Sequence, residues 1–191
     1  PNGASQWISG ADSRRWVHQL RAGCDAVVVG GGTVRADDPL LTSRGRRDPE
    51  PLRVVLSRGL DLPVEAQLWD TASAATLVAH GPEAAGKQAP NGPERLELEQ
   101  CEPLPLMRHL AARGCNQVLW ECGPELAAAA IRQGCVQEVA AVLAPKLMGG
   151  TAARTPLGEL DFTAMDQVLS GEWQPPRPIG DDWLISLRLG G

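Results

Sequence analysis

The sequence predicts an α/β fold in which helices flank a mostly parallel central sheet with an antiparallel C-terminal edge. Two observations carry this prediction. Short apolar runs rich in β-branched residues alternate with stretches of helical periodicity, the pattern that βαβ units and a parallel sheet produce. The last two runs are joined by a proline-rich stretch with no room for a helix, so we expect them to pair antiparallel.

The first helix is expected to open at Ser9, where Asp12 three residues later resembles a capping box. Trp16 and Leu20, four residues apart, share a face of this helix, and Gly23 is the expected residue just after its end. The other expected elements are helices at 103–113 and 124–133, a surface loop at 84–93, and strands at 25–29, 53–56, 76–79, 95–98, 117–120, 138–144, 166–169 and 183–189.

The composition is that of one globular domain: 191 residues, of which 43% are hydrophobic and 21% charged. A formal net charge of −5 gives no general attraction to nucleic acid or to anionic membranes, so neither partner is expected. No apolar run approaches the roughly 20 residues of a membrane span, and the polar start lacks the basic region of a signal peptide. We therefore expect a cytoplasmic location. Because the chain lacks an initiator Met, we also expect it to begin inside a longer one.

Metal binding and a disulfide framework are not expected. The five cysteines, at positions 24, 101, 115, 122 and 135, are odd in number and include no CxxC pair or Cys/His ligand spacing. They are interpreted as small buried thiols. The three histidines, His18, His80 and His109, fall on helices or at a strand end without ligand partners, and we interpret them as structural.

Three consecutive glycines, Gly30 to Gly32, follow the first expected strand, where an α/β fold places a phosphate loop. The stretch fails as a dinucleotide fingerprint, because Arg35 stands where the third glycine belongs and no acidic residue follows about 20 positions on. It also fails as a P-loop, because no Gly-Lys-Ser/Thr ends it. From the glycines alone, a plain turn and a nucleotide loop stay equally open.

The residues after these glycines favour a binding role. The hydroxyl of Thr33 lies beside the loop amides, and carboxylates and a guanidinium follow at Asp37, Asp38 and Arg44. Arginine can hold a phosphate through two hydrogen bonds. The alternative is that Arg44, with its arginine neighbours at 46 and 47, belongs to a solvated run of charge.

A second glycine turn follows the expected strand at 117–120. Glu121 stands at the end of that strand, where α/β folds place ligand-binding residues. Pro124 then opens a helix at a favoured first-turn position, directly after Gly123. The free amides of such a helix start form an anion site, so we expect Glu121 and this turn to be functional.

Taken in order, five motifs resemble one family. They are Ser5-Gln6-Trp7, Arg21 at the end of the first helix, the stretch GGGTVRADDPLLTSR, the turn ECGPEL, and APKLMGG at residues 144–150. The chain is similar, from Ser5 to about Gly150, to the reductase domain of the bifunctional riboflavin-biosynthesis deaminase/reductase. The resemblance implies a dihydrofolate-reductase-like fold.

The resemblance also implies the reaction and the site. The family reduces the ribosyl group of 5-amino-6-(5-phosphoribosylamino)uracil to a ribityl chain with NADPH, and it is typically a homodimer. The cofactor positions it implies are Trp7, Thr33, Asp37, Ser57, Gly123, Pro124, Glu125, Leu126, Ala127, Ala128 and Ala129. The substrate positions are Ser5, Arg21, Leu41, Arg44 and Glu121, with the arginines suited to the 5-phosphate. Glu121 is the first candidate for proton handling at the ribose and Asp37 the second. Arg35 and Arg58 are candidates for the 2′-phosphate of NADPH.

The chain departs from the family pattern at its start. The family begins this domain with a strand that carries a Lys and ends in Ser-x-Asp-Gly, and nothing like it precedes Pro1. We expect an N-terminally truncated fragment, with two unpaired sheet edges where that strand is missing. The zinc signature of a deaminase half does not occur either.

Other functions stay open. One alternative is a reductase for the non-deaminated diaminopyrimidinone substrate, which has the same fold. Another is a catalytically silent nucleotide-binding module, favoured by the missing first strand. A purely structural protein would not need Trp7, Thr33, Asp37 and Glu121 together.

Overall fold

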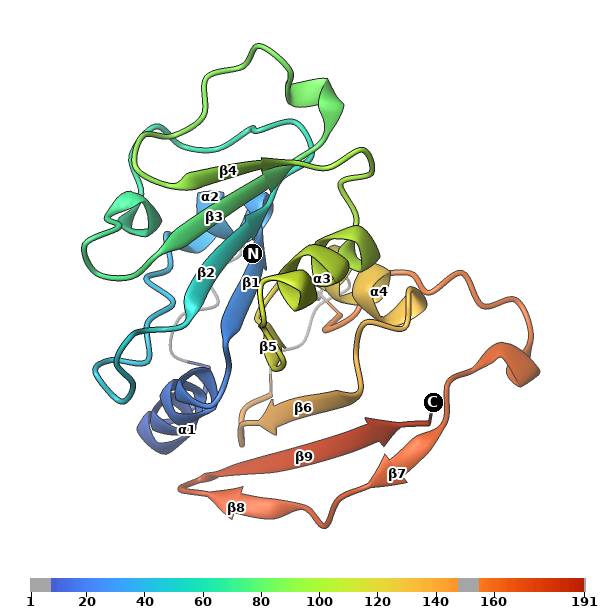
Figure 1. The fold of residues 1–191 in the computed structure, drawn as a ribbon. Coiled ribbons are helices and arrows are strands. Elements are labelled where there is room, and N and C mark those ends of the chain that lie inside the picture. The colour runs from blue at the N-terminus through green and yellow to red at the C-terminus, as the bar shows by residue number, and fades with distance from the viewer. Residues whose placement is uncertain (1–7, 148–154, 191) are drawn as a thin grey trace.

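The computed structural model describes residues 8–147 and 155–190 of the chain. Their strands form two sheets (Figure 1). The larger is five-stranded and parallel throughout, in the order β4-β3-β2-β1-β5. The smaller is antiparallel and is built around β9, which pairs with β6 on one side and with β7 and β8 on the other.

The strands are β1 Ala26–Gly30, β2 Leu52–Leu56, β3 Thr76–His80, β4 Glu94–Glu97, β5 Val118–Trp120, β6 Glu138–Leu143, β7 Gly171–Trp173, β8 Arg177–Ile179 and β9 Asp182–Leu189. The helices are α1 Ala11–Ala22, α2 Gly31–Asp37, α3 Pro103–Ala112 and α4 Pro124–Arg132. Single 3-10 turns lie at Gln67–Trp69, Pro82–Ala84 and Met165–Gln167. None of the helices in the described ranges is long and apolar enough to cross a membrane.

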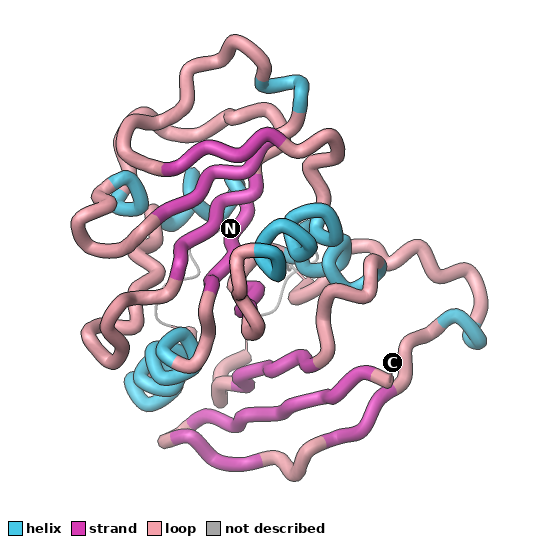
Figure 2. Tube along the Cα trace, viewed as in Figure 1, coloured by secondary structure: helices cyan, strands magenta, loops and turns pink. Residues whose placement is uncertain are grey.

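The core lies on both faces of the parallel sheet, which explains why β1, β2 and β3 are almost continuously apolar. On one face, Val28, Val54 and Leu77 pack with Leu106 and Leu110 of α3, beside which α4 lies (Figure 2). The opposite face packs against α2 and the segment after it, through Val27, Val29, Val55, Val34 and Leu41. The strand ends that carry the site are thereby held between two packed layers.

The predicted α/β class with a parallel central sheet is confirmed, and seven of the expected strands and three helices occur within a few residues of their predicted limits. The strand predicted at 166–169 is wrong. That segment holds a 3-10 turn, and the partner of β9 begins later, at Gly171. The proline-rich stretch also contributes β8, which was not predicted. Its Pro178 is tolerated because β8 is an edge strand, where a residue without N–H need not complete a ladder.

The antiparallel strands form a sheet of their own rather than an edge of the central sheet. Within the described residues, β5 pairs only with β1, and β6 pairs only with β9. Each therefore has one unpaired edge.

The predicted capping box at the start of α1 is wrong. Gly10 is the N-cap, and no side chain within the helix caps it. Instead, Asp182 at the start of β9 accepts hydrogen bonds from the Gly10 amide (2.7 Å) and from Ser13 Oγ (2.5 Å). Asp12 pairs with Arg15 on the helix surface. The cap comes from a residue some 170 positions away, and it ties α1 to the smaller sheet.

Candidate functional site

Two adjacent cavities lie at the carboxyl ends of the central strands, where parallel sheets bind ligands. The larger, about 540 Å³, is lined by Thr33, Asp37, Pro39, Leu41, Trp120, Glu121, Cys122 and Gly123. The smaller, about 430 Å³, is lined by Arg14, His18, Arg21, Asp37, Asp38, Pro39, Leu40, Arg44 and Gln67. Both include Asp37 and Pro39, so the two cavities share one wall.

The three glycines form the start of a helix, not a loop. Gly30 is the N-cap of α2, and Gly31 and Gly32 are its first residues. Their small size serves packing: a Cβ on Gly31 would lie 2.9 Å from Ser57 Oγ, and one on Gly30 would lie 3.4 Å from Leu126 of α4. The expected phosphate loop is therefore corrected to a close junction between α2, the end of β2 and α4.

The second glycine turn faces the first across the larger cavity. Gly123 is the N-cap of α4, and no side chain caps that helix. A Cβ added to Gly123 would lie 3.9 Å from Thr33 Oγ1, so the glycine keeps open the space between the two helix starts. Amides at the start of α4 and the Thr33 hydroxyl suit the phosphates and ribose of a nucleotide.

Arg21 and Glu121 form a partly buried ion pair in which the side chains are 11% and 34% exposed. Arg21 Nε donates to Glu121 Oε2 (2.8 Å) and Arg21 Nη2 donates to Oε1 (2.6 Å). Arg21 Nη1 also donates to the carbonyl of Thr42 (2.9 Å), which fixes the guanidinium on a third side. The two charges therefore hold each other in one orientation at the rim shared by α1 and β5.

The segment that joins α2 to β2 is strained. Asp38, Leu41 and Arg44 have left-handed backbone conformations, with φ of 40°, 57° and 58°, although none is glycine. Leu41 is nevertheless 1% exposed, so packing holds it in this conformation. Backbone strain of this kind concentrates at binding sites. It turns Leu41 toward the larger cavity and Arg44 toward the smaller one.

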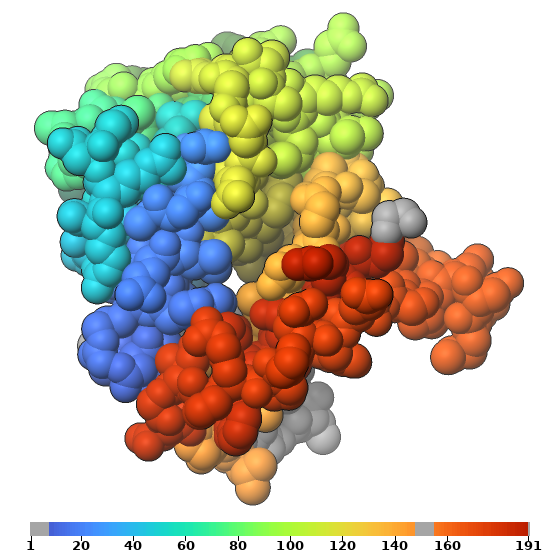
Figure 3. Space-filling model, turned by 60° about the horizontal axis from the view of Figure 1, so that its bottom comes forward, coloured from blue at the N-terminus to red at the C-terminus, as the bar shows by residue number. Residues whose placement is uncertain are grey.

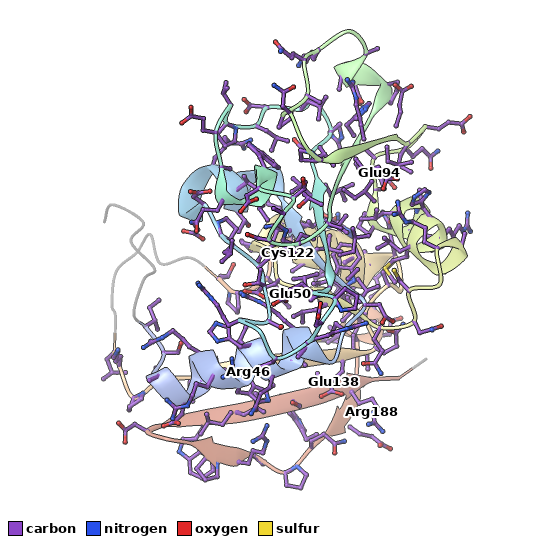
Figure 4. The ribbon with its side chains drawn as sticks, turned by 60° about the vertical axis from the view of Figure 1, so that its left-hand side comes forward. Arg46, Glu50, Glu94, Cys122, Glu138 and Arg188 are labelled. Carbon is purple, nitrogen blue, oxygen red and sulfur yellow. The ribbon has the colours of Figure 1, made fainter. Side chains whose placement is uncertain are left out.

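Two charged side chains stabilise this segment, Arg53, which is buried, and Glu50, which is partly buried. Arg53 is fully buried in β2 and donates to the carbonyls of Asp70 (2.7 Å) and Ala74 (2.6 Å), with longer bonds to those of Leu40 and Gln67. The carboxylate of Glu50 accepts from the amides of Ser43 and Gly45 (Figure 4). Burial opposes the Glu50 charge, but these amides outweigh it and hold its pKa below the ordinary value. Neither role was predicted from the sequence, which does not show the carbonyl and amide partners of the two side chains.

His18, interpreted from the sequence as a structural residue, lies in the lining of the smaller cavity. Burial lowers the pKa of its imidazole, and the positive charges of Arg21, Arg46 and Arg44 lower it further, against a smaller opposite effect of Glu121. Arg46 lies beside α1 in Figure 4, in agreement with this effect. The imidazole is therefore surrounded by cations.

Cys122 follows Glu121 in the wall of the larger cavity. Burial, with a contribution from the Glu121 charge, raises the pKa of its thiol to about 12. The thiol stays protonated at neutral pH. Only Cys24 and Cys135 are fully buried, whereas Cys101, Cys115 and Cys122 are partly buried, so the interpretation of all five as buried thiols is corrected. In the part of the chain that the structure describes, no group of three or more His, Cys, Asp or Glu side chains is arranged to hold a metal ion.

Comparison with known proteins assigns the family. A family model of the RibD C-terminal domain matches residues 1–176. The chain belongs to this family. It is 51% identical to the riboflavin biosynthesis protein RibD of Synechocystis over 98% of the chain, and 40% identical to the chloroplastic riboflavin biosynthesis protein PYRR of Arabidopsis thaliana over 97% of it. It covers 52% and 32% of those two proteins, so it spans at most about half of their length.

A solved structure of Acinetobacter baumannii RibD superimposes with a TM-score of 0.81 at 29% identity, over 100% of this chain and 54% of the other. The dihydrofolate-reductase-like fold of the RibD reductase domain is thereby confirmed for this chain.

Seven of the fourteen predicted site residues that the structure describes meet at the two cavities. Thr33, Asp37, Leu41, Glu121 and Gly123 line the larger one, and Arg21, Asp37 and Arg44 line the smaller. Ser57 lines neither; it is 8% exposed, and its hydroxyl lies against Gly31. Of residues 123–129, only Gly123 is in a cavity wall. Ser5 and Trp7 lie outside the described residues.

Sequence reasoning missed Arg14 and His18 as site residues. Their spacing from Arg21, at i, i+4 and i+7, puts all three on one face of α1 and was the available signal. Gln67 was not predictable from the sequence, because it reaches the site through its hydrogen bonds to Asp38, 29 positions away.

Proposed function

We propose that this chain is the reductase part of a riboflavin-biosynthesis enzyme, which reduces the ribosyl group of 5-amino-6-(5-phosphoribosylamino)uracil with NADPH. The observation that carries the proposal is the pair of adjoining cavities. One lies between two glycine-led helix starts, as a nucleotide requires, and the other is walled by cationic side chains, as a sugar phosphate requires. Their shared wall brings the two ligands together at Asp37.

The larger cavity fits NADPH. A Cβ added at Gly123 would project into the opening toward Thr33 Oγ1, 3.9 Å away, and the start of α4, which has no side-chain cap among the described residues, offers amides to a pyrophosphate. Residues 123–129, Thr33 and Asp37, with Trp7 and Ser57, are the proposed cofactor residues. When bound, NADPH supplies the hydride that reduces C1 of the ribose. The protein's own part is to align the two ligands and to exclude water.

The proposed proton-handling residues are Glu121 and Asp37, and the geometry favours Asp37 for the transfer itself. Both carboxylate oxygens of Glu121 already accept hydrogen bonds from Arg21, so the Glu121 carboxylate is engaged in an ion pair. The Asp37 side chain lines both cavities and is exposed. Ring opening of the substrate's N-glycosylamine needs a proton at the ribose oxygen and a charge to stabilise the resulting imine. We assign the first need to Asp37, through water, and the second to Glu121.

A homodimer is proposed through the smaller sheet. Strand alternation puts Val139, Leu143, Trp173, Trp183 and Leu187 on one face, because Trp183 pairs with Leu143 and Leu187 pairs with both Val139 and Trp173. The other face holds Asp182 and Leu184, which are buried toward α1. Leu143, Trp173 and Trp183 are 60%, 67% and 49% exposed, on a side of the molecule where the C-terminal strands reach the surface (Figure 3). A second copy would cover this apolar face.

We also propose that a strand outside the described residues pairs with the edges of β5 and β6 that have no partner strand within residues 8–147 and 155–190, and so joins the two sheets. The two edges belong to strands that follow each other along the chain, separated only by α4. Unpaired edges of this kind are normally covered.

The test of the function is a titration of the chain with NADPH and NADH, followed by tryptophan fluorescence, and a turnover assay that follows NADPH consumption. We expect NADPH to bind more tightly than NADH, and the uracil substrate to be turned over faster than its non-deaminated diaminopyrimidinone analogue. An Asp37→Asn variant should bind NADPH and lose turnover.

Each alternative makes a different prediction. Faster turnover of the diaminopyrimidinone would identify the other reductase. Binding of NADPH without turnover, both in this chain and in a version extended by the family's N-terminal strand, would indicate a silent nucleotide-binding module. Restored turnover in the extended version alone would support the reductase function and the missing strand together.

A further inference from the structure

Helix α1 presents a row of cationic and titratable side chains to the smaller cavity. Arg14, His18 and Arg21 follow each other at spacings of four and three residues, so they lie along one face of the helix, and all three line the cavity. Arg44 lines it as well, from the strained segment after α2. Three guanidinium groups and one imidazole therefore converge on a space of about 430 Å³.

The charges around His18 come from every element packed against it. From its own helix come Arg14 and Arg21, and from the segment after α2 come Arg44 and Arg46. The negative charges are Glu121 at the end of β5, and Asp37 and Asp38 at the end of α2. Glu121 is already paired with Arg21, and Asp38 accepts a hydrogen bond from the Gln67 amide (2.8 Å). In the absence of a ligand, burial and then the surrounding positive charges lower the pKa of the His18 imidazole, which favours its neutral form.

We propose that Arg14 and His18 recognise the phosphate group of the pentose phosphate substrate, and that His18 takes up a proton when that phosphate binds. The inference rests on the proposed function and deepens it, because it assigns one end of the substrate to the α1 side of the smaller cavity. A phosphate dianion placed among these groups offsets the surrounding positive charge and favours the imidazolium, which then donates a hydrogen bond to a phosphate oxygen. The proton comes from solvent, and no covalent bond is formed or broken.

This mechanism sets the sign of the pH dependence. Because binding takes up a proton, affinity for a phosphate monoester falls as the pH rises from the low pKa of His18 in the free protein to its higher pKa in the complex. A site made of arginines alone behaves differently. Arginines stay charged, and a phosphate monoester is already a dianion above its second pKa of about 6, so affinity would be flat above about pH 7.

The experiment is a calorimetric titration with ribose 5-phosphate between about pH 6.5 and pH 8.5. The lower limit of this range lies near the pKa of an ordinary imidazole. Ribose serves as the ligand without a phosphate. We expect the affinity for ribose 5-phosphate to fall about tenfold over this range, and ribose to bind far more weakly at every pH. His18→Gln should weaken binding about tenfold at the lowest pH and remove the pH dependence, because one charge-assisted hydrogen bond is lost. His18→Lys should keep tight binding and also remove the pH dependence.

Arg14→Gln should weaken binding about tenfold without changing the pH profile, whereas Arg15→Gln, on the exposed side of the same helix, should change neither. If the affinity of His18→Gln for ribose 5-phosphate depends on pH as that of the wild type does, the inference is overturned. The proposed function would still stand in that case, provided that the uracil substrate is turned over. Failure of ribose 5-phosphate to bind also overturns it. Where the uracil substrate is turned over neither by this chain nor by the version extended by the family's N-terminal strand, the proposed function fails as well.

Discussion

Arg21 and Glu121, one hundred residues apart in sequence, are joined by two hydrogen bonds of 2.8 Å and 2.6 Å at the carboxyl end of the central sheet. The pair links α1 to the end of β5 and stands between the two cavities, since Arg21 lines the smaller and Glu121 the larger. A substitution at either residue is therefore expected to alter both cavities, and so the binding of both proposed ligands. The guanidinium keeps its position only while the carboxylate accepts both of its donors.

Replacing Glu121 with Gln should lower turnover much more than NADPH affinity. The amide keeps the size of the side chain but removes the charge, and its NH₂ group faces a donor of Arg21. We expect kcat/KM for the uracil substrate to fall about 100-fold, with a change of less than about threefold in the Kd for NADPH. Glu138→Gln, an exposed carboxylate on β6 near Arg188 of β9 (Figure 4), is the control. Equal losses in turnover and in cofactor affinity would argue against the assigned role.

Replacing Gly123 with Ala should weaken NADPH binding without unfolding the protein. The Gly123 backbone has φ of −71°, which alanine adopts, and the nearest atom to the new Cβ would be Thr33 Oγ1 at an ordinary contact distance of 3.9 Å. The methyl group would occupy the space between the two helix starts. We expect the Kd for NADPH to rise about tenfold or more, measured by tryptophan fluorescence, while the circular dichroism spectrum stays the same. Gly190→Ala is the control, because Gly190 lines neither cavity and the nearest atom to its added Cβ would be the Ser170 carbonyl oxygen, at an ordinary contact distance of 3.7 Å.

The sequence was sufficient for the parts of this fold that local chemistry decides. The β-branched runs of β1, β2 and β3 and the glycines after α3 and α4 predicted those elements closely, because each signal lies within the element itself. The start of α1 was predicted wrongly because its capping partner, Asp182, lies on β9. The role of Arg53 was missed for a related reason, since the carbonyls that it binds belong to the two connections that flank β2, and only the folded chain brings them together.

For the site, the family motifs identified residues that touch the two cavities, but not how those residues are paired. Nothing local to Glu121 shows that Arg21 occupies both of its oxygens. The position of His18 among arginines from two segments is likewise a tertiary property. The identity of these site residues could therefore be predicted from the sequence, whereas their pairing and electrostatic surroundings could be established only from the structure.

Asp182 should contribute to stability at neutral pH and lose that contribution in acid. The hydrogen bond from Ser13 Oγ, followed by that from the Gly10 amide, lowers the pKa of its carboxyl group. A carboxyl whose pKa is lowered by folding stabilises the native state above its unfolded pKa of about 3.9, and this stabilisation is lost as the pH falls through the folded value. Asp182→Asn should therefore lower the Tm at pH 7, and the difference from the wild type should shrink below about pH 4. Asp181→Asn, its exposed neighbour, should leave the Tm unchanged at both pH values. A constant difference between Asp182→Asn and the wild type across this range would contradict the assignment.

The apolar face of the smaller sheet should determine the oligomeric state. Trp173 and Trp183 are the large exposed aromatic residues of this face, and large aromatic side chains at the centre of an interface supply much of its binding free energy. The double variant Trp173→Gln/Trp183→Gln should therefore sediment as a monomer at protein concentrations where the wild type is a dimer. Glu172→Gln changes the residue next to Trp173 on the opposite face of β7, and it should leave the dimer intact. Analytical ultracentrifugation of the three proteins measures both effects. If the wild type is a monomer at all concentrations, or if the double variant remains a dimer, this face is not the subunit interface.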